Sequence, residues 1–215
     1  MSGWWAQEAW ESSPLLLLSW VFWVIFSIVL HELGHGWAAL SQGDDTPRVT
    51  GHMTWNPVVH MGWPSLLVFA VVGIAWGLMP VNPARFRDGR LGSAIVSAAG
   101  PAMNLGLAAL SLTAGVLLRR SGVDSPEVLA FFSLGGWLNV YLLLFNLLPI
   151  PPLDGSRILG ACSPTLEAVF SQPAVASMGF MLFLLVGLSG GMSFMSALAA
   201  NLARRFQDGL TQLLG

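Results

Sequence analysis

The sequence predicts an all-α, multi-span membrane protein. Of its 215 residues, 54% are hydrophobic and 9% are charged, whereas a soluble domain averages about 25% charged residues. Several apolar stretches are also long enough to cross a bilayer as helices, which takes roughly 20 residues. The charges nearly balance, at a net charge of −2. We therefore expect no nucleic-acid partner, because binding to phosphates requires an excess of cationic side chains.

Four apolar stretches are long enough to span the membrane as helices. We expect these helices at residues 14–40, 92–118, 128–148 and 175–203. A fifth stretch, at 65–79, has about 15 residues and would reach only about 22 Å as a helix. It is predicted to be either a short span or a re-entrant segment, which is tolerated where other parts of the protein cover its backbone.

The connections between these stretches are short and rich in glycine and proline, so we expect residues 1–215 to form a single transmembrane core without an appended regulatory module. No basic region precedes the first apolar stretch, which argues against a cleaved signal peptide. The single cysteine, Cys162, cannot form an internal disulfide or a thiolate metal cluster.

Three ionisable residues lie within the first predicted span, in the sequence HELGH at 31–35. A charge at the centre of a bilayer costs at least about 2.5–3.5 kcal/mol, so these residues need a compensating partner. Positions i and i+4 share one face of a helix, so His31 and His35 can bind one metal ion. Glu32 can then take a proton from a water molecule. The alternative is a buried polar cluster that hydrogen bonds alone satisfy.

A third metal ligand is available in the segment NLLPIPPLDG at 146–155. Its three prolines break a helix, so we expect Asp154 to lie on an extended stretch. Catalytic zinc usually takes three protein ligands, and a mixed histidine and aspartate set suits Zn²⁺. Asp154 alone could instead cap a following helix, but the nearby pair of His31 and His35 favours the ligand hypothesis.

Together these motifs resemble the site-2 protease family of intramembrane zinc metalloproteases. HELGH at 31–35 is similar to the zinc-binding helix of that family, and NLLPIPPLDG at 146–155 to its second signature. GPAMN at 100–104 resembles the family's GPxxN element on the intervening helix. TWNPVVH at 54–60 and PVNP at 80–83 resemble stretches of the minimal members, which lack PDZ and CBS domains. The resemblance implies a transmembrane helix bundle of the site-2 protease type.

The resemblance also implies roles for individual residues. One Zn²⁺ per chain would be held by His31, His35 and Asp154, and Glu32 would be the general base. Asn146 would contact the substrate backbone or the developing oxyanion.

Three further residues are candidates for substrate binding or gating, namely Asn56, His60 and Asn104. The more ordinary alternative for each is a loop or a helix-bridging hydrogen bond. We expect Asp44 and Asp45 to form a solvated exit from the first helix.

A shared metal site constrains the topology. His35 lies near the end of the 14–40 helix and Asp154 just after the 128–148 helix, so these two helices should run in the same direction. An odd number of crossings must separate them, and 92–118 supplies one. We therefore expect 65–79 to enter and return, with 52–64 as part of the dip.

The expected function is zinc-dependent hydrolysis of peptide bonds in or near transmembrane segments, as in regulated intramembrane proteolysis. The protein would be an integral multi-pass protein of the cell (inner) membrane of a prokaryote. Its partners would be the lipid bilayer and a transmembrane-protein substrate, with a regulatory membrane protein or a second copy of the chain as further candidates.

Two alternatives to this function are considered. A protease that cleaves outside the bilayer, such as a prenyl-protein endopeptidase, would take its third ligand from a downstream glutamate. The later glutamate here, Glu167, lies outside any such motif. A catalytically inactive scaffold or metal carrier that grips transmembrane helices would be expected to lose Glu32 first.

Overall fold

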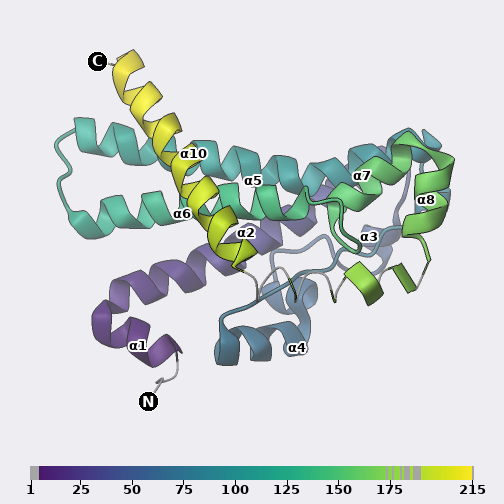
Figure 1. Ribbon diagram of the computed structural model, residues 1–215, viewed down its shortest axis with the longest axis horizontal. Helices are drawn as coiled ribbons and strands as arrows, with labels where there is room; N and C mark the ends of the chain where they lie inside the picture. The colour runs from purple at the N-terminus through teal and green to yellow at the C-terminus, as the bar shows by residue number, and fades with distance from the viewer. Residues whose placement is uncertain are drawn as a thin grey trace.

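The computed structural model describes residues 5–172, 174–175, 177–179, 181, 185 and 190–214, and none of these residues lies in a β-strand. The described elements, in chain order, are the helices α1 Trp5–Ser12, α2 Pro14–Ser41, α3 Thr46–Val49, α4 Pro57–Val72, the 3₁₀ helix η1 Pro83–Arg85, α5 Gly89–Arg120, α6 Pro126–Asn146, α7 Asp154–Cys162, α8 Pro164–Phe170 and α10 Gly191–Leu214 (Figure 1). The predicted all-α fold class is confirmed.

Among the described residues, three helices, α2, α5 and α6, are long and apolar enough to cross a membrane. They match the stretches predicted at 14–40, 92–118 and 128–148, with ends that differ by a few residues. The stretch predicted at 175–203 lies partly outside the described residues. Residues 191–203 of this stretch belong to α10, which continues to Leu214.

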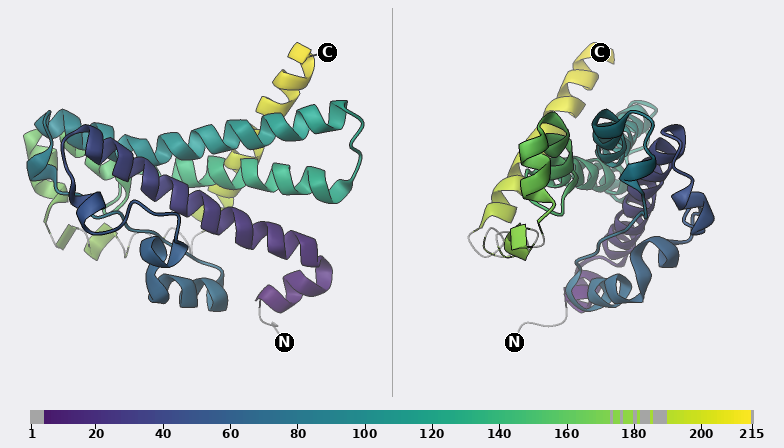
Figure 2. Two further views of the ribbon diagram at one scale, coloured as in Figure 1. Left: turned by 180° about the vertical axis from the view of Figure 1, so that it is seen from behind. Right: turned by 90° about the vertical axis from the view of Figure 1, so that its right-hand side faces the viewer.

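The three long helices form one bundle in which α5 runs opposite to the other two. A short turn at 121–125 joins α5 to α6 as an antiparallel pair, and α2 packs against both (Figure 1). The left view of Figure 2 shows that α2 and α6 run in the same direction. Their C-terminal ends therefore lie at the same end of the bundle, as a shared metal site requires.

Three helices begin with the same local pattern, a side-chain cap followed by proline. The side-chain oxygens of Ser13, Asn56 and Ser125 accept hydrogen bonds from backbone N–H groups in the first turns of α2, α4 and α6. The proline at the first helical position has no N–H to leave unsatisfied, and its fixed φ suits a helix. These caps explain why the predicted starts of α2 and α6 lie close to the observed ones.

A glycine pair on α6 lets the neighbouring helices approach closely. A Cβ atom at Gly135 would overlap the indole of Trp23 on α2, and one at Gly136 would overlap Leu112 on α5. Trp23 also donates a hydrogen bond from Nε1 to the carbonyl of Phe131, at 2.8 Å. Small residues of this kind are typical of helix contacts within membranes.

The segment between α2 and α5 leaves the bundle and returns to the end from which it started. The Arg87 N–H donates to the carbonyl of Gln42 at 2.8 Å, and the Asp88 N–H donates to the Gln42 side chain at 3.2 Å. The Asn82 N–H donates to Asp44 Oδ2 at 2.7 Å. These bonds pin together the exit from α2 and the entry to α5.

Asp44 is fully buried, so the expectation that it is solvated was wrong. It accepts hydrogen bonds from the Asn82 N–H and from the N–H and hydroxyl of Thr46. Burial alone raises the pKa of Asp44, but these bonds outweigh it and hold the pKa below its ordinary value. Its neighbour Asp45 is exposed, as expected, and pairs with Arg85.

The apolar stretch predicted at 65–79 is divided between a helix and an extended return. Helix α4 starts earlier, at Pro57, and is kinked at Gly62, which has a φ of 67° and is followed two residues later by Pro64. It ends at Gly73, whose φ of 81° is a left-handed C-cap. From there the chain runs without helix to η1. Figure 2 shows α4 beside α2 and apart from the α5–α6 pair.

Hydrogen bonds hold the extended return against α4. The Leu78 N–H donates to the carbonyl of His60 at 2.9 Å. The buried hydroxyl of Ser65 donates to the carbonyl of Trp76 at 2.7 Å and accepts from its N–H at 2.9 Å. The return is thus held in place beside α2 and its HELGH sequence.

Candidate metal centre

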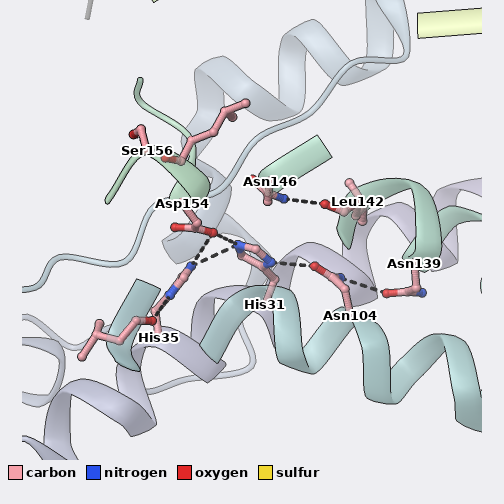
Figure 3. Close-up of polar contacts among 10 residues, drawn as sticks. His31, His35, Asn104, Asn139, Leu142, Asn146, Asp154 and Ser156 are labelled. Carbon is pink, nitrogen blue, oxygen red and sulfur yellow. Dashed lines mark hydrogen bonds and ion pairs between the residues drawn. The ribbon is translucent and has the colours of Figure 1, made fainter. Parts of the chain in front are cut away.

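Two elements bring three potential metal ligands to one point at the end of the bundle. His31 and His35 come from α2, and Asp154 is the first residue of α7 (Figure 3). The Nε2 atoms of the two histidines are 3.0 Å apart. Asp154 Oδ2 lies 3.2 Å from His31 Nε2 and 3.3 Å from His35 Nε2. All three residues are buried.

Asp154 does not lie on an extended stretch, as the prolines predicted, but begins a new helix. The prolines end α6 and occupy the turn at 149–152. Leu153 follows with an extended backbone and is the N-cap residue of α7. A carboxylate is favourable in the first helical turn, where N–H groups are unsatisfied. A Cβ at Gly155 would overlap the carbonyl of Leu147, so glycine allows α7 to start against the end of α6.

Each histidine uses Nδ1 for a hydrogen bond and presents Nε2 to the other ligands. His35 Nδ1 lies 2.7 Å from the backbone carbonyl of Val96. His31 Nδ1 lies 2.6 Å from the side-chain oxygen of Asn104. Because a carbonyl oxygen can only accept, Nδ1 must carry the proton, and the neutral ring then has a bare Nε2.

This arrangement fits a zinc ion. Two bare nitrogens and a carboxylate oxygen, all within 3.3 Å of one another, repel unless a cation lies among them. Zinc takes nitrogen and oxygen ligands at about 2.0–2.2 Å, and a tetrahedral set is then about 3.3–3.6 Å apart along its edges. The candidate ligand atoms of His31, His35 and Asp154 lie 3.0–3.3 Å apart, close to this spacing.

Gly100 brings α5 up to the ligands. A Cβ atom at this position would overlap Nε2 of both His31 and His35. Four residues later on the same helix, Asn104 supplies the hydrogen bond to His31. The GPAMN sequence thus contributes both close approach and ligand orientation.

The side chain of Glu32, which belongs to α2, lies between that helix and the extended return. It is 7% exposed. A Cβ at Gly77 would come within 2.5 Å of Glu32 Oε1, so the return passes directly over this carboxylate. The absence of a side chain at Gly77 leaves room for Glu32 beside the ligands.

The other residues predicted for the site are placed differently. The Asn146 side chain donates to the carbonyl of Leu142 at 3.0 Å and lies beside the triad in Figure 3. Asn56 caps α4 by accepting from the Val58 N–H, and His60 lies 2.7 Å from the carbonyl of Thr54. Of the residues proposed for substrate binding or gating, Asn104 alone contacts a ligand.

Sequence reasoning missed Asn139 on α6. Its side-chain oxygen accepts a hydrogen bond from Asn104 at 2.9 Å. Asn104 in turn contacts His31, so Asn139 is linked to His31 through one residue. Asn139 lies seven residues before Asn146, and therefore on the same face of the helix. A second asparagine on that face of an apolar helix was the available signal.

Comparisons with known proteins point to one family of metallopeptidases. Peptidase family M50 matches residues 117–188. YwhC of Bacillus subtilis is 38% identical over 181 residues, which cover 80% of this chain and 82% of that protein. Rip2 of Mycolicibacterium smegmatis is 36% identical over 66% of this chain and 55% of its own length. MJ0611 of Methanocaldococcus jannaschii is 28% identical over 72% of this chain and 75% of its own.

Each of these relatives carries the name "Putative zinc metalloprotease". No solved structure matches the chain. The membrane-length helices and the candidate metal-ligand triad, together with these relatives, define a membrane-embedded metalloprotease with a zinc cofactor. The chain belongs to peptidase family M50, the site-2 protease family.

Proposed function

We propose that this chain hydrolyses peptide bonds in or near transmembrane segments of membrane-protein substrates. His31, His35 and Asp154 would hold one Zn²⁺, and Glu32 would act as the general base. The observation that carries the proposal is the buried triad beside Glu32, with both histidines on a helix long enough to span the membrane. A substrate that reaches this site must itself be accessible from within the bilayer.

The chain's own residues support hydrolysis. Zinc, when bound, supplies a Lewis acid that polarises a carbonyl and acidifies water. Glu32 would accept the proton of the attacking water and deliver it to the leaving amine nitrogen. The hydrogen bonds to Val96 and Asn104 hold the imidazoles in place during this transfer. Asn146 would turn from Leu142 to donate to the substrate carbonyl.

The segment from 46 to 81 would be re-entrant. Its ends are pinned together through Gln42 and Asp44, so it starts and finishes at the same end of α2. Several apolar side chains of α4 point outward and would face lipid, including Trp63 and Leu67 at 68% and 62% exposure. The polar backbone of the return is partly satisfied by Ser65 and His60.

The proposed setting is the cell membrane of a prokaryote, as the bacterial and archaeal sources of the relatives suggest. The substrate would be a transmembrane protein, and a regulatory membrane protein or a second copy of the chain would control access to the site. The alternative is a scaffold that binds metal and grips transmembrane helices without cleaving them.

Metal removal separates these functions. The purified chain in detergent is expected to cleave a test transmembrane substrate, to lose this activity when a chelator removes zinc, and to regain it when zinc is restored. Magnesium serves as the control and should not restore cleavage, because it prefers an octahedral set of oxygen ligands. A scaffold would hold zinc without cleaving, and cleavage that persists in zinc-free protein would contradict the proposal.

A further inference from the structure

A chain of buried polar side chains crosses the bundle from α2 through α5 to α6 and back. His31 contacts Asn104 Oδ1 at 2.6 Å, and Asn104 Nδ2 donates to Asn139 Oδ1 at 2.9 Å (Figure 3). Asn139 Nδ2 donates to Ser27 Oγ, also at 2.9 Å. Ser27, Asn104 and Asn139 are fully buried. Polar groups at such positions are costly unless each is hydrogen-bonded, and here the bonds form one connected series.

Asn139 determines which group donates and which accepts along this series of hydrogen bonds. Asn139 Nδ2 also donates to the backbone carbonyl of Gly135, at 2.9 Å. A backbone carbonyl can only accept, so the NH₂ group of Asn139 must face Gly135 and its oxygen must face Asn104. The NH₂ group of Asn104 then faces Asn139, and its oxygen faces His31. His31 Nδ1 is left with the donor role.

We propose that Asn139 is a positioning residue that, through Asn104, holds His31 in the tautomer able to bind metal. The two orientations of an asparagine amide have almost the same shape, so packing alone does not select one. Without Asn139, Asn104 could present its NH₂ group to His31 and draw the ring proton to Nε2. In that tautomer Nε2, the nitrogen that faces Asp154 and His35, has no free lone pair for the metal.

His35 is held in the same tautomer by a backbone carbonyl, without a side chain in between. His35 Nδ1 bonds to the backbone carbonyl of Val96. His31 bonds instead to a side-chain amide, which can rotate, and therefore requires the next residue to hold that amide. Partners behind a ligand typically change metal affinity by about 10–100-fold when they are removed.

The proposal rests on the proposed zinc site and goes beyond it by giving Asn139 a role there. A purely structural role is the competing explanation, since Asn139 also bridges α2, α5 and α6. Ser111 provides a matched control, because its buried hydroxyl donates to the carbonyl of Phe132 and joins the same α5–α6 pair at 2.7 Å. It does not belong to the series that ends at His31.

The test compares the zinc affinity of purified wild-type, Asn139→Leu and Ser111→Ala proteins by competition with a chelator. Asn139→Leu is expected to bind zinc at least about 10-fold more weakly, while Ser111→Ala stays within about 2-fold of wild type even if its thermal stability falls. In an Asn104→Leu background, the Asn139→Leu change should have no further effect on zinc affinity. Wild-type affinity in a folded Asn139→Leu protein would overturn the proposal.

A measurement on the metal-free wild type keeps the test independent of folding in the variants. Nitrogen NMR of ¹⁵N-histidine-labelled protein, with the signal assigned by its loss in His31→Ala, reports which ring nitrogen carries the proton. We expect the proton on Nδ1 of His31, and a proton on Nε2 would overturn the proposal. If the wild type has this tautomer but binds no zinc, the proposed function fails while the positioning of His31 stands.

Discussion

Three glycines let the site close around its ligands. A Cβ at Gly100 would overlap the ligand nitrogens of His31 and His35, one at Gly77 would reach Glu32, and one at Gly155 would overlap the end of α6. Each glycine lies on a different element, namely α5, the extended return and α7. Close backbone approach therefore shapes the site at three points, with α5 against the two histidines, the return against Glu32 and the start of α7 against the end of α6.

Gly100→Ala is expected to abolish or strongly weaken zinc binding. The added methyl group would occupy the position of the two Nε2 atoms, so at least one imidazole must turn away. We expect at least about a 10-fold loss of zinc affinity, measured by competition with a chelator.

Gly106→Ala is the control for that change. It lies on the same helix, and its Cβ would meet nothing within 4 Å. Alanine should leave zinc affinity unchanged there and raise helix stability by up to about 1 kcal/mol. Undiminished zinc affinity in Gly100→Ala would show that α5 does not pack against the ligands as described.

The residues at the metal site differ in how far sequence could predict them. His31 and His35 follow from helical periodicity, and Asp154 from a carboxylate in the proline-rich segment after an apolar stretch, a role that the resemblance also implies. Asn139 and Gly77 could not be predicted in the same way, since their proximity to the site depends on how α6 and the extended return pack against α2. No local pattern encodes that packing.

At the scale of elements, the excursion between α2 and α5 completes the site. Gln42 and Asp44 anchor its two ends to each other, while its extended return covers Glu32. One of the hydrogen bonds that lower the pKa of Asp44, from the Asn82 N–H, also ties the end of the return to the exit from α2. The excursion therefore positions a wall of the site rather than serving as a simple connection.

Cysteine labelling tests whether this excursion re-enters the membrane. Val49→Cys and Arg87→Cys, each in a Cys162→Ser background, place single exposed thiols on its two flanks. Because the flanks are pinned at one end of the bundle, we expect both thiols to react with a membrane-impermeant reagent from the same side. Labelling from opposite sides would require the segment to cross the membrane and would contradict this topology.

Sequence predicted the long helices better than the segments between them. Length and apolar composition suffice for α2, α5 and α6. The excursion was harder, because the helix in it ends at Gly73 while the apolar composition continues. The start of α7 was also missed, since the prolines indicated extended chain and not how soon a helix resumes.

At the scale of the whole molecule, the site joins segments more than 100 residues apart in sequence. The parallel helices α2 and α6 finish at the same end of the bundle, because α5 lies between them in the chain and runs in the opposite direction. The candidate ligands therefore meet at that end (Figures 1 and 2). The parallel arrangement followed from requiring one metal site for His35 and Asp154.

The most direct measurement compares wild-type and Glu32→Gln proteins at equal zinc content on the same transmembrane substrate in detergent. Glutamine keeps the size of the side chain but cannot accept the proton, so we expect zinc to remain bound and cleavage to fall by at least about 100-fold. Zinc content is measured on the same samples by elemental analysis. Equal cleavage by the two zinc-loaded proteins would contradict the role of Glu32 and, with it, the proposed protease mechanism.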